Sequence, residues 1–264
     1  MSGGINVNIF QKVIINADDF GLSLGICKAI DELMKLGAIS DTTVMMLTPD
    51  VAEGAKHYPY VFLNNKAGVH LQLPGKIALT QFEKKVSKHI INEENIKKED
   101  VLKLDKQRVF DEWDSQIACF IRMFKQRPTH LDSHMGYHRT VEFREVYLAL
   151  AQKYKIPVRG GEAPFPSIMR AYNVNGTTRF VRGWSGKELP YGTLKNKLLE
   201  LKKSSDPLKD VIEITCHPGY VDDVLCARSH LTVGRKHDYN EVLDIYKTNW
   251  LKKNGFELVS FNNL

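Results

Sequence analysis

The sequence has few cysteines and lacks any long hydrophobic run. Only 4 of its 264 residues are cysteine, and no two of them have the Cys-x-x-Cys spacing of a zinc site or redox motif. We therefore expect reduced and mostly buried thiols, which are typical of the cytoplasm. No apolar run approaches the ~20 residues of a transmembrane helix, and residues 1–10 do not resemble a secretory signal. These absences predict a cytoplasmic protein with no membrane segment.

The sequence also lacks internal repeats, low-complexity linkers and any cluster of basic residues. The formal net charge is +6, but the lysines and arginines are scattered in doublets. A nucleic-acid interface requires basic residues on one surface, so solvated helix faces explain the charge better. Binding to DNA or RNA would instead have to be steeply salt-dependent. We expect one continuous domain over residues 1–264, because α/β barrels commonly need about 250 residues.

The first informative feature is an acidic pair that follows a short apolar run. Residues 13–15 (Val-Ile-Ile) predict a buried strand, with Asp18 and Asp19 at its end. Side chains alternate along a strand, so we expect the two carboxylates to point in different directions. Ser23 is expected to cap a helix over residues 24–36. The pair would then lie at the carboxyl end of a strand, where α/β proteins place their ligands.

Two other interpretations of the acidic pair must be weighed. Paired acids at a strand end can simply cap the next helix or face solvent. An Asp-Asp pair after a first strand also occurs in phosphoacceptor signalling domains. The histidines that follow in the sequence argue against the second interpretation.

Histidines are concentrated in a short run between residues 130 and 138. Its nine residues, His-Leu-Asp-Ser-His-Met-Gly-Tyr-His, hold three histidines and one aspartate, although the whole chain has only 9 histidines. A divalent metal and the groups around it require imidazoles as ligands and a carboxylate that fixes their tautomer. The alternative is a polar loop rich in histidine. Elsewhere, His70 lies in an expected strand and could equally be a hydrogen-bonded core residue.

Alternating strand and helix patterns run along the rest of the chain. A charged segment at 74–106 breaks this rhythm and is expected to be an insertion that borders the site. Residues 162–190 have no clear pattern, although Tyr172 and Trp184 there could line a sugar-sized pocket or pack in the core. A loop is expected from His217 to Asp238. Further strands are expected near 39–47, 67–73, 156–159, 211–216 and 256–261, and helices near 49–57, 107–125, 146–154, 194–201 and 242–250.

The residues capable of chemistry share one position in this outline. Asp18, Asp19, His70, the 130–138 run, Arg159 and His217 all lie at or near the carboxyl ends of expected strands. This layout predicts an irregular (β/α) barrel of about seven strands with its site on the carboxyl face. One carboxylate and two imidazoles would leave coordination positions open on a metal, so that a bound water could attack a carbonyl. A further carboxylate and a histidine could then serve as base and acid in amide cleavage.

Four motifs together resemble the YdjC-like carbohydrate deacetylases, the family that includes chitooligosaccharide deacetylase. The resemblance extends from about residue 13 to residue 260, with the motifs in the same order. Jointly the motifs are specific, although no single one is. They are Asn-Ala-Asp-Asp-Phe-Gly at 16–21, Gly-Val-His-Leu at 68–71, His-Leu-Asp-Ser-His at 130–134 and His-Pro-Gly at 217–219.

The resemblance implies a metal-dependent amidase that removes an acetyl group from an N-acetylated sugar. The fold would be an irregular barrel related to the polysaccharide deacetylases. By position, Asp19, His70 and His134 match the metal ligands. Asp18 matches the base, His217 matches the acid on the opposite side, and Arg159 matches a residue that holds the base.

The chain departs from the family after its third ligand. Relatives often have His-His-His after Asp-Ser, whereas this chain has Met135 and Gly136 after His134. The departure concerns substrate contacts rather than chemistry, because the metal ligand is retained. The resemblance favours magnesium, while the ligand set also suits zinc, cobalt or manganese. It further implies a possible homodimer.

Other functions remain open from the sequence. The same hydrolytic site could act on a non-sugar amide or an ester. A non-catalytic, metal-dependent sugar-binding protein is a second alternative, but it would need neither Asp18 nor His217. The sugar, its chain length and the acetyl position that reacts do not follow from the sequence.

Overall fold

Strand β1, Gln11–Phe20, is the centre of a parallel sheet in the computed structural model, which describes residues 9–73, 101–186 and 189–264. The strand is buried from Val13 onward, as its apolar start predicts. It pairs with β6 (Val211–Cys216) along one edge. Its other edge is shared, because Gln11 to Val13 pair with β7 (Phe256–Leu258) and Asn16 to Phe20 pair with β2 (Asp41–Val44). The sheet therefore forks at β1.

The strand order of the described sheet is β4-β3-β2-β1-β6-β5, and every pairing is parallel. The outer strands are β3 (Ala67–Leu71), β4 (Leu131–Ser133) and β5 (Arg179–Phe180). Parallel strands place all their carboxyl ends at one rim, so the topology gathers the candidate residues there. The α/β fold with about seven parallel strands that the sequence predicts is thus confirmed.

The sheet curls into a half-barrel, and the segment at 156–159 helps to join its sides. We expected a strand there, which is wrong, because only Val158 forms bridges, one to Leu131 and one to Gly176. These bridges link the start of β4 to the segment that leads into β5. Arg159 follows directly and so still reaches the rim.

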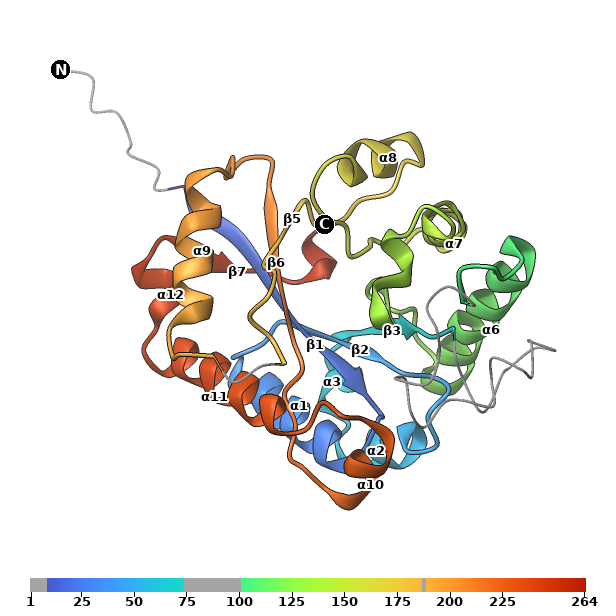
Figure 1. Ribbon diagram of the computed structural model, residues 1–264, viewed down its shortest axis with the longest axis horizontal. Helices are drawn as coiled ribbons and strands as arrows, with labels where there is room; N and C mark the ends of the chain where they lie inside the picture. Colours follow the sequence, from blue (N-terminus) through green and yellow to red (C-terminus); the bar gives the residue numbers. More distant parts are fainter. Residues whose placement is uncertain (1–8, 74–100, 187–188) are drawn as a thin grey trace.

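Helices cover the sheet on its outer side, with α1, α9, α11 and α12 toward one side and α6, α7 and α8 toward the other (Figure 1). Most lie within a few residues of their expected positions. The loop expected up to Asp238 is wrong, because α10 and the start of α11 occupy it. The described helices are α1 (Leu24–Leu36), α2 (Val51–His57), α3 (Tyr60–Leu63), α6 (Lys106–Phe124), α7 (Arg144–Tyr154), α8 (Phe165–Ala171), α9 (Thr193–Lys203), α10 (Asp223–Arg228), α11 (Val233–Lys247) and α12 (Trp250–Lys253), with short 3-10 helices η2 (His134–Arg139) and η3 (Phe261–Asn263).

Helix α1 has the bounds that the sequence predicts because both of its ends carry a capping signal. The Ser23 hydroxyl accepts a hydrogen bond from the Ile26 N–H, which satisfies one free donor of the first turn. Gly37 ends the helix in a left-handed conformation with φ of 76°. The cap at Ser23 follows the acidic pair closely, so it fixes where the chain leaves the rim.

The described residues form a continuous apolar core between the sheet and the helices. Trp184 belongs to this core at 1% exposure, and Tyr172 packs against it, so neither residue lines the rim pocket described below. In the described part of the chain, no helix combines the length and apolar character that crossing a membrane would require. The insertion expected at 74–106 lies mostly outside the described residues.

Candidate metal centre

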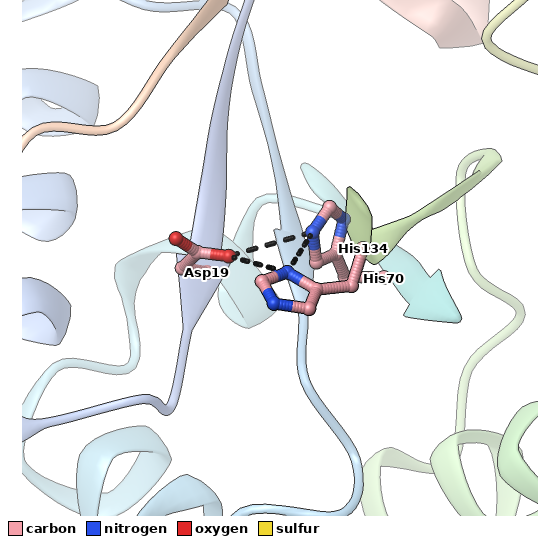
Figure 2. Close-up of side chains that lie close together, drawn as sticks. All are labelled: Asp19, His70 and His134. Atoms are coloured by element: carbon pink, nitrogen blue, oxygen red, sulfur yellow. Dashed lines mark hydrogen bonds and ion pairs between the residues drawn. The ribbon is translucent and has the colours of Figure 1, made fainter. Parts of the chain in front are cut away.

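Asp19, His70 and His134 converge at the rim of the half-barrel, each from a different element (Figure 2). Asp19 comes from β1, His70 from β3 and His134 from the residue after β4. Asp19 Oδ1 lies 3.4 Å from both His70 Nε2 and His134 Nδ1, and these two nitrogens are 3.2 Å apart. Three donor atoms therefore point at a common position.

The spacing and chemistry of these atoms fit a divalent metal ion. Ligands about 2.1 Å from a metal at angles of 90–110° lie about 3.0–3.4 Å from each other, which matches the three separations. Asp19 Oδ1 is buried and has no hydrogen-bond partner among the described residues. A buried carboxylate oxygen without a partner is costly, and a cation would satisfy it. The residues present therefore fit the metal that the sequence predicts.

A local distortion of β1 brings both carboxylates of the acidic pair to the same pocket. Regular alternation would send Asp18 and Asp19 to opposite faces, as we expected. Asp19 instead has φ of 74°, and the β1–β2 register shifts between Ala17 and Phe20. Both side chains consequently line the rim pocket. Such strain in a residue other than glycine commonly marks a functional site.

Asp132 and Thr43 orient His70. The β3–β4 register pairs His70 with Asp132, and Asp132 Oδ1 lies 2.6 Å from His70 Nδ1. A proton on Nδ1 donated to this carboxylate leaves Nε2 free to bind a metal. The Thr43 hydroxyl contributes a hydrogen bond to the other oxygen of Asp132. Burial alone would lower the pKa of His70, but the charge of Asp132 raises it.

His134 begins the 3-10 helix η2, and the two residues after it have unusual backbone angles. Met135 has φ of 58° and Gly136 has φ of 68°, so the chain turns sharply away from the metal position. Met135 is 58% exposed and lines the rim pocket. Met135 and Gly136, where we expect the sequence to depart from the family pattern, therefore form part of the pocket wall.

The other two histidines of the 130–138 run do not join the metal position. The His130 ring stacks on Phe261, with ring centroids 3.7 Å apart. His138 Nδ1 lies 2.7 Å from the Ser133 hydroxyl. Burial holds the pKa of both imidazoles well below the usual value, which keeps them neutral. The run therefore provides one candidate ligand and two structural histidines.

Arg159 holds Asp18 through a bidentate contact. Its Nη1 and Nη2 atoms donate to Asp18 Oδ2 and Oδ1 at 2.8 and 2.7 Å, and its Nε donates to Glu213 at 2.6 Å. Burial would raise the pKa of Asp18, but the Arg159 guanidinium outweighs it and holds that pKa well below the usual value. Asp18 is therefore a fixed, ionised carboxylate next to the metal position.

Arg235 is a residue of the site that the sequence did not reveal. It lies on α11, is almost completely buried, and donates from Nη2 to Asp19 Oδ2 at 2.8 Å. Burial would raise the pKa of Asp19, but the charge of Arg235 lowers it. The contact occupies one oxygen of Asp19 and leaves Oδ1 directed at the metal position.

The hydrogen-bonded network around the metal position has an excess of negative charge. Its four carboxylates face two guanidinium groups, which leaves a formal charge of −2 when the imidazoles are neutral. A buried charge excess of this sign favours a divalent cation. The carboxylates are those of Asp18, Asp19, Asp132 and Glu213, and the guanidiniums are those of Arg159 and Arg235.

His217 stands across the pocket from the two candidate histidine ligands. It follows β6, and its Nε2 lies 3.8 Å from Asp18 Oδ2. Its other nitrogen, Nδ1, lies 2.7 Å from the Ser185 hydroxyl. A proton on Nε2 could therefore pass to a group bound between His217 and the metal position.

A pocket of about 440 Å³ contains all six residues that the sequence singles out. Its size suits a sugar unit, and its walls combine charged and apolar side chains. The structure thus brings together every site residue that the sequence predicts, namely Asp18, Asp19, His70, His134, Arg159 and His217. The pocket is also lined by Ser133, Met135, Gly136, His138, Arg139, Phe180, Thr215, Ser229, Leu231 and Arg235.

The fold and the site define a class of α/β protein. Its parallel strands present one carboxylate and two imidazoles that suit a divalent metal, and Asp18 and His217 lie beside them. The family model for YdjC-like proteins matches residues 12–253, so the chain belongs to this family.

Named relatives and a solved structure are similar to the chain over most of its length. A carbohydrate deacetylase of Halalkalibacterium halodurans is 30% identical over 248 residues, which cover 87% of this chain and 94% of the relative. A chitooligosaccharide deacetylase of Yersinia enterocolitica is 26% identical, with 96% and 99% covered. A crystal structure of an Enterococcus faecalis protein superposes with a TM-score of 0.78 at 25% identity, covering 96% of this chain and 98% of the other.

Proposed function

We propose that the chain is a metal-dependent hydrolase that removes an N-acetyl group from an acetylated amino sugar or short oligosaccharide and releases acetate. The observation that carries this proposal is the placement of Asp18 and His217 beside the three candidate ligands. A metal site that only bound sugar would need neither group. The names of the relatives support a deacetylase that acts on carbohydrate.

Each side chain has a role that follows from its surroundings. A divalent cation held by Asp19, His70 and His134 would polarise the acetyl carbonyl and acidify a water molecule. Asp18, ionised and held by Arg159, would accept the proton of the attacking water. His217 would donate a proton from Nε2 to the departing amine, which must leave as a neutral group. The apolar walls Met135, Phe180 and Leu231 would contact the flat face of a sugar ring.

The identity of the metal is a further part of the proposal. Two imidazole nitrogens and one carboxylate oxygen favour zinc, cobalt or manganese over magnesium, which prefers oxygen ligands. The family resemblance favours magnesium instead. Titration of the metal-free protein with each ion, followed by calorimetry and by acetate release, would distinguish magnesium from zinc, cobalt and manganese.

The remaining parts of the proposal concern the whole protein. We propose a single deacetylase domain over residues 1–264, with an insertion at 74–106, that works in the cytoplasm and can form a homodimer. The four cysteines are free, and Cys27 and Cys216 are buried, which suits a reducing compartment. The homodimer rests on the family resemblance and is tested by light scattering at several protein concentrations.

The activity is tested by supplying the metal-loaded protein with N-acetylated amino sugars of one to four units and measuring acetate by NMR. We expect acetate release, and a loss of about 10²-fold or more in Asp18→Asn and His217→Gln. A panel of non-sugar acetamides and acetate esters runs in parallel. Faster turnover of that panel than of every sugar would contradict the proposed substrate class, and no acetate from any compound would contradict a deacetylase.

A further inference from the structure

Ser185 lies between His217 and a buried carboxylate, Asp238 of α11. The Ser185 hydroxyl is 2.7 Å from His217 Nδ1 and also contacts Asp238 Oδ2. The direct separation of His217 Nδ1 and Asp238 Oδ2 is 3.9 Å, which is too long for a hydrogen bond. Any interaction between the imidazole and the carboxylate therefore passes through the serine.

The directions of these hydrogen bonds follow from the donors around Asp238. The backbone N–H groups of Gly186 and His217 both donate to this carboxylate, at 3.0 and 2.8 Å. A carboxylate that receives backbone donors acts as an acceptor, so Ser185 donates its only proton to it. The Ser185 oxygen is then left as an acceptor and takes its hydrogen bond from the Nδ1–H of His217. In neutral His217, the proton must consequently reside on Nδ1.

The same geometry excludes Ser185 as a nucleophile of a Ser-His-Asp triad. In such a triad the serine and the aspartate contact opposite nitrogens of the imidazole. Here Ser185 and Asp238 lie on the same side, next to Nδ1, and Nε2 faces Asp18. Neither Ser185 nor Asp238 lines the rim pocket. Both residues therefore contact or face the Nδ1 side of His217, away from the pocket.

We propose that Ser185 and Asp238 are positioning residues that fix the Nδ1–H tautomer of His217 and direct Nε2 into the pocket. When His217 is protonated, the chain of hydrogen bonds places the second proton on Nε2, where the leaving amine would receive it. No bond is made or broken by Ser185 or Asp238 themselves. The inference deepens the role of His217 and rests on the proposed deacetylase function.

The tautomer can be measured directly by ¹⁵N NMR of the histidine side chains in the metal-free protein. Signals of His217 are identified by their loss in His217→Gln. We expect the neutral ring to carry its proton on Nδ1 in the parent and to shift toward the Nε2–H form in Ser185→Ala. Asp238→Asn should shift the tautomer in the same direction. An amide N–H at position 238 can donate to the Ser185 oxygen, and the Ser185 hydroxyl then donates to His217 Nδ1. Ser115→Ala is the matched control, since Ser115 is half-buried on α6 and its hydroxyl donates to the Asp111 carbonyl of the same helix.

A kinetic comparison provides the second test. An amine leaving group needs a proton, whereas the phenolate of 4-nitrophenyl acetate leaves without one. Ser185→Ala should therefore lower kcat for an N-acetylated sugar by about 10-fold or more while changing turnover of the ester by less than about twofold. Ser185→Thr keeps the hydroxyl and should restore most of the lost kcat.

The outcomes separate this inference from the proposed function. An equal loss on both substrates in Ser185→Ala, or a parent His217 with its proton on Nε2, would overturn the positioning role. A parent protein that releases no acetate from any acetamide would overturn the proposed function instead. In that case the tautomer measurement still decides whether Ser185 and Asp238 fix His217.

Discussion

Asp18 and Asp19 are adjacent residues with different partners, and this difference supports the roles that we propose for them. Arg159 holds both oxygens of Asp18, whereas Arg235 holds only one oxygen of Asp19. Asp19 therefore keeps one oxygen for a cation, and Asp18 does not. In the sequence only the family resemblance distinguished them, because the two guanidinium groups lie far along the chain.

Substitution of the two aspartates should separate metal binding from catalysis. Asp19→Ala should weaken metal binding by about 10²-fold or more, because one of three ligands is lost. Asp18→Asn should bind the metal within a few-fold of the parent but lose about 10²–10⁴-fold in acetate release. Calorimetric titration measures the metal affinity of both variants, and an acetate assay measures their activity. Equal metal affinities in the two variants would contradict the assignment.

Removal of Arg235 should destabilise the metal-free protein. Arg235→Met leaves the buried Asp19 carboxylate without its counter-ion, and breaking a buried ion pair in this way costs about 3–5 kcal/mol in the free energy of unfolding. Urea unfolding measures this cost. The double variant Asp19→Asn, Arg235→Met should recover much of the loss, since no unpaired charge remains. No recovery in the double variant would show that Arg235 stabilises by packing alone.

At the scale of elements, the sequence predicted α1 to the residue but missed the start of α11, and the difference has a physical reason. Helix α1 has a serine cap, an apolar stripe and a terminal glycine, and all three signals are local. The first turns of α11 instead bury Arg235 and Asp238, which are polar. Buried polar residues erase the apolar periodicity that marks a helix, so the pattern was recognisable only from Val242 onward. The helix that supports the site was therefore the hardest to recognise.

The residues that line the pocket were predicted better than the residues that hold them in place. Motifs of Asp, His and Arg at strand ends identify groups that contact a ligand, because those residue types are chemically distinctive. Glu213, Ser185 and Asp238 act on these groups from elements that pack together only in the fold. The two isolated bridges of Val158 could not be distinguished from a strand, since the apolar run around this residue is short.

Strand β2 is joined to the C-terminal η3 through Asp41, and this link should be sensitive to pH. Asp41 accepts hydrogen bonds from the Ser260 hydroxyl and the Phe261 N–H, yet burial raises its pKa from 3.8 to about 6. The folded state therefore holds the proton more tightly than the unfolded state. The stabilising contribution is complete below about pH 4 and is lost as the pH rises through about 6, a change of roughly 3 kcal/mol.

Asp41→Asn should remove this pH dependence, because an amide can accept the same hydrogen bonds without ionising. Relative to the parent, the variant should gain stability between pH 4 and pH 7. Urea unfolding at unit pH steps measures the gain, with Asp111→Asn, on an exposed face of α6, as the control. A difference between variant and parent that stays constant with pH would contradict the role of Asp41.

At the scale of the whole molecule, the candidate ligands join strands that are not neighbours. Asp19 lies on β1, while His70 lies on β3 and His134 follows β4, and β2 separates the two groups in the sheet. A bound cation would therefore connect two parts of the half-barrel that backbone hydrogen bonds do not join directly. We therefore expect metal binding and global stability to be linked.

Metal addition should raise the unfolding temperature of the protein, and a chelator should lower it again. At a free metal concentration 100 times Kd, binding to the folded state alone adds about 2.7 kcal/mol to the free energy of unfolding. Differential scanning calorimetry with and without EDTA measures the shift, and Asp19→Ala should abolish it. The same shift in Asp19→Ala would place the metal elsewhere.

The order in which the counter-ions occur along the chain has a consequence for biosynthesis. The carboxylates of Asp18 and Asp19 leave the ribosome first, but their guanidinium partners, Arg159 and Arg235, belong to the second half of the protein. During translation, the amino-terminal part of the chain therefore emerges while Asp18 and Asp19 still lack the arginines that neutralise them. We therefore expect burial of β1 to be completed only after the two arginines have been synthesised, when most of the polypeptide has left the ribosome.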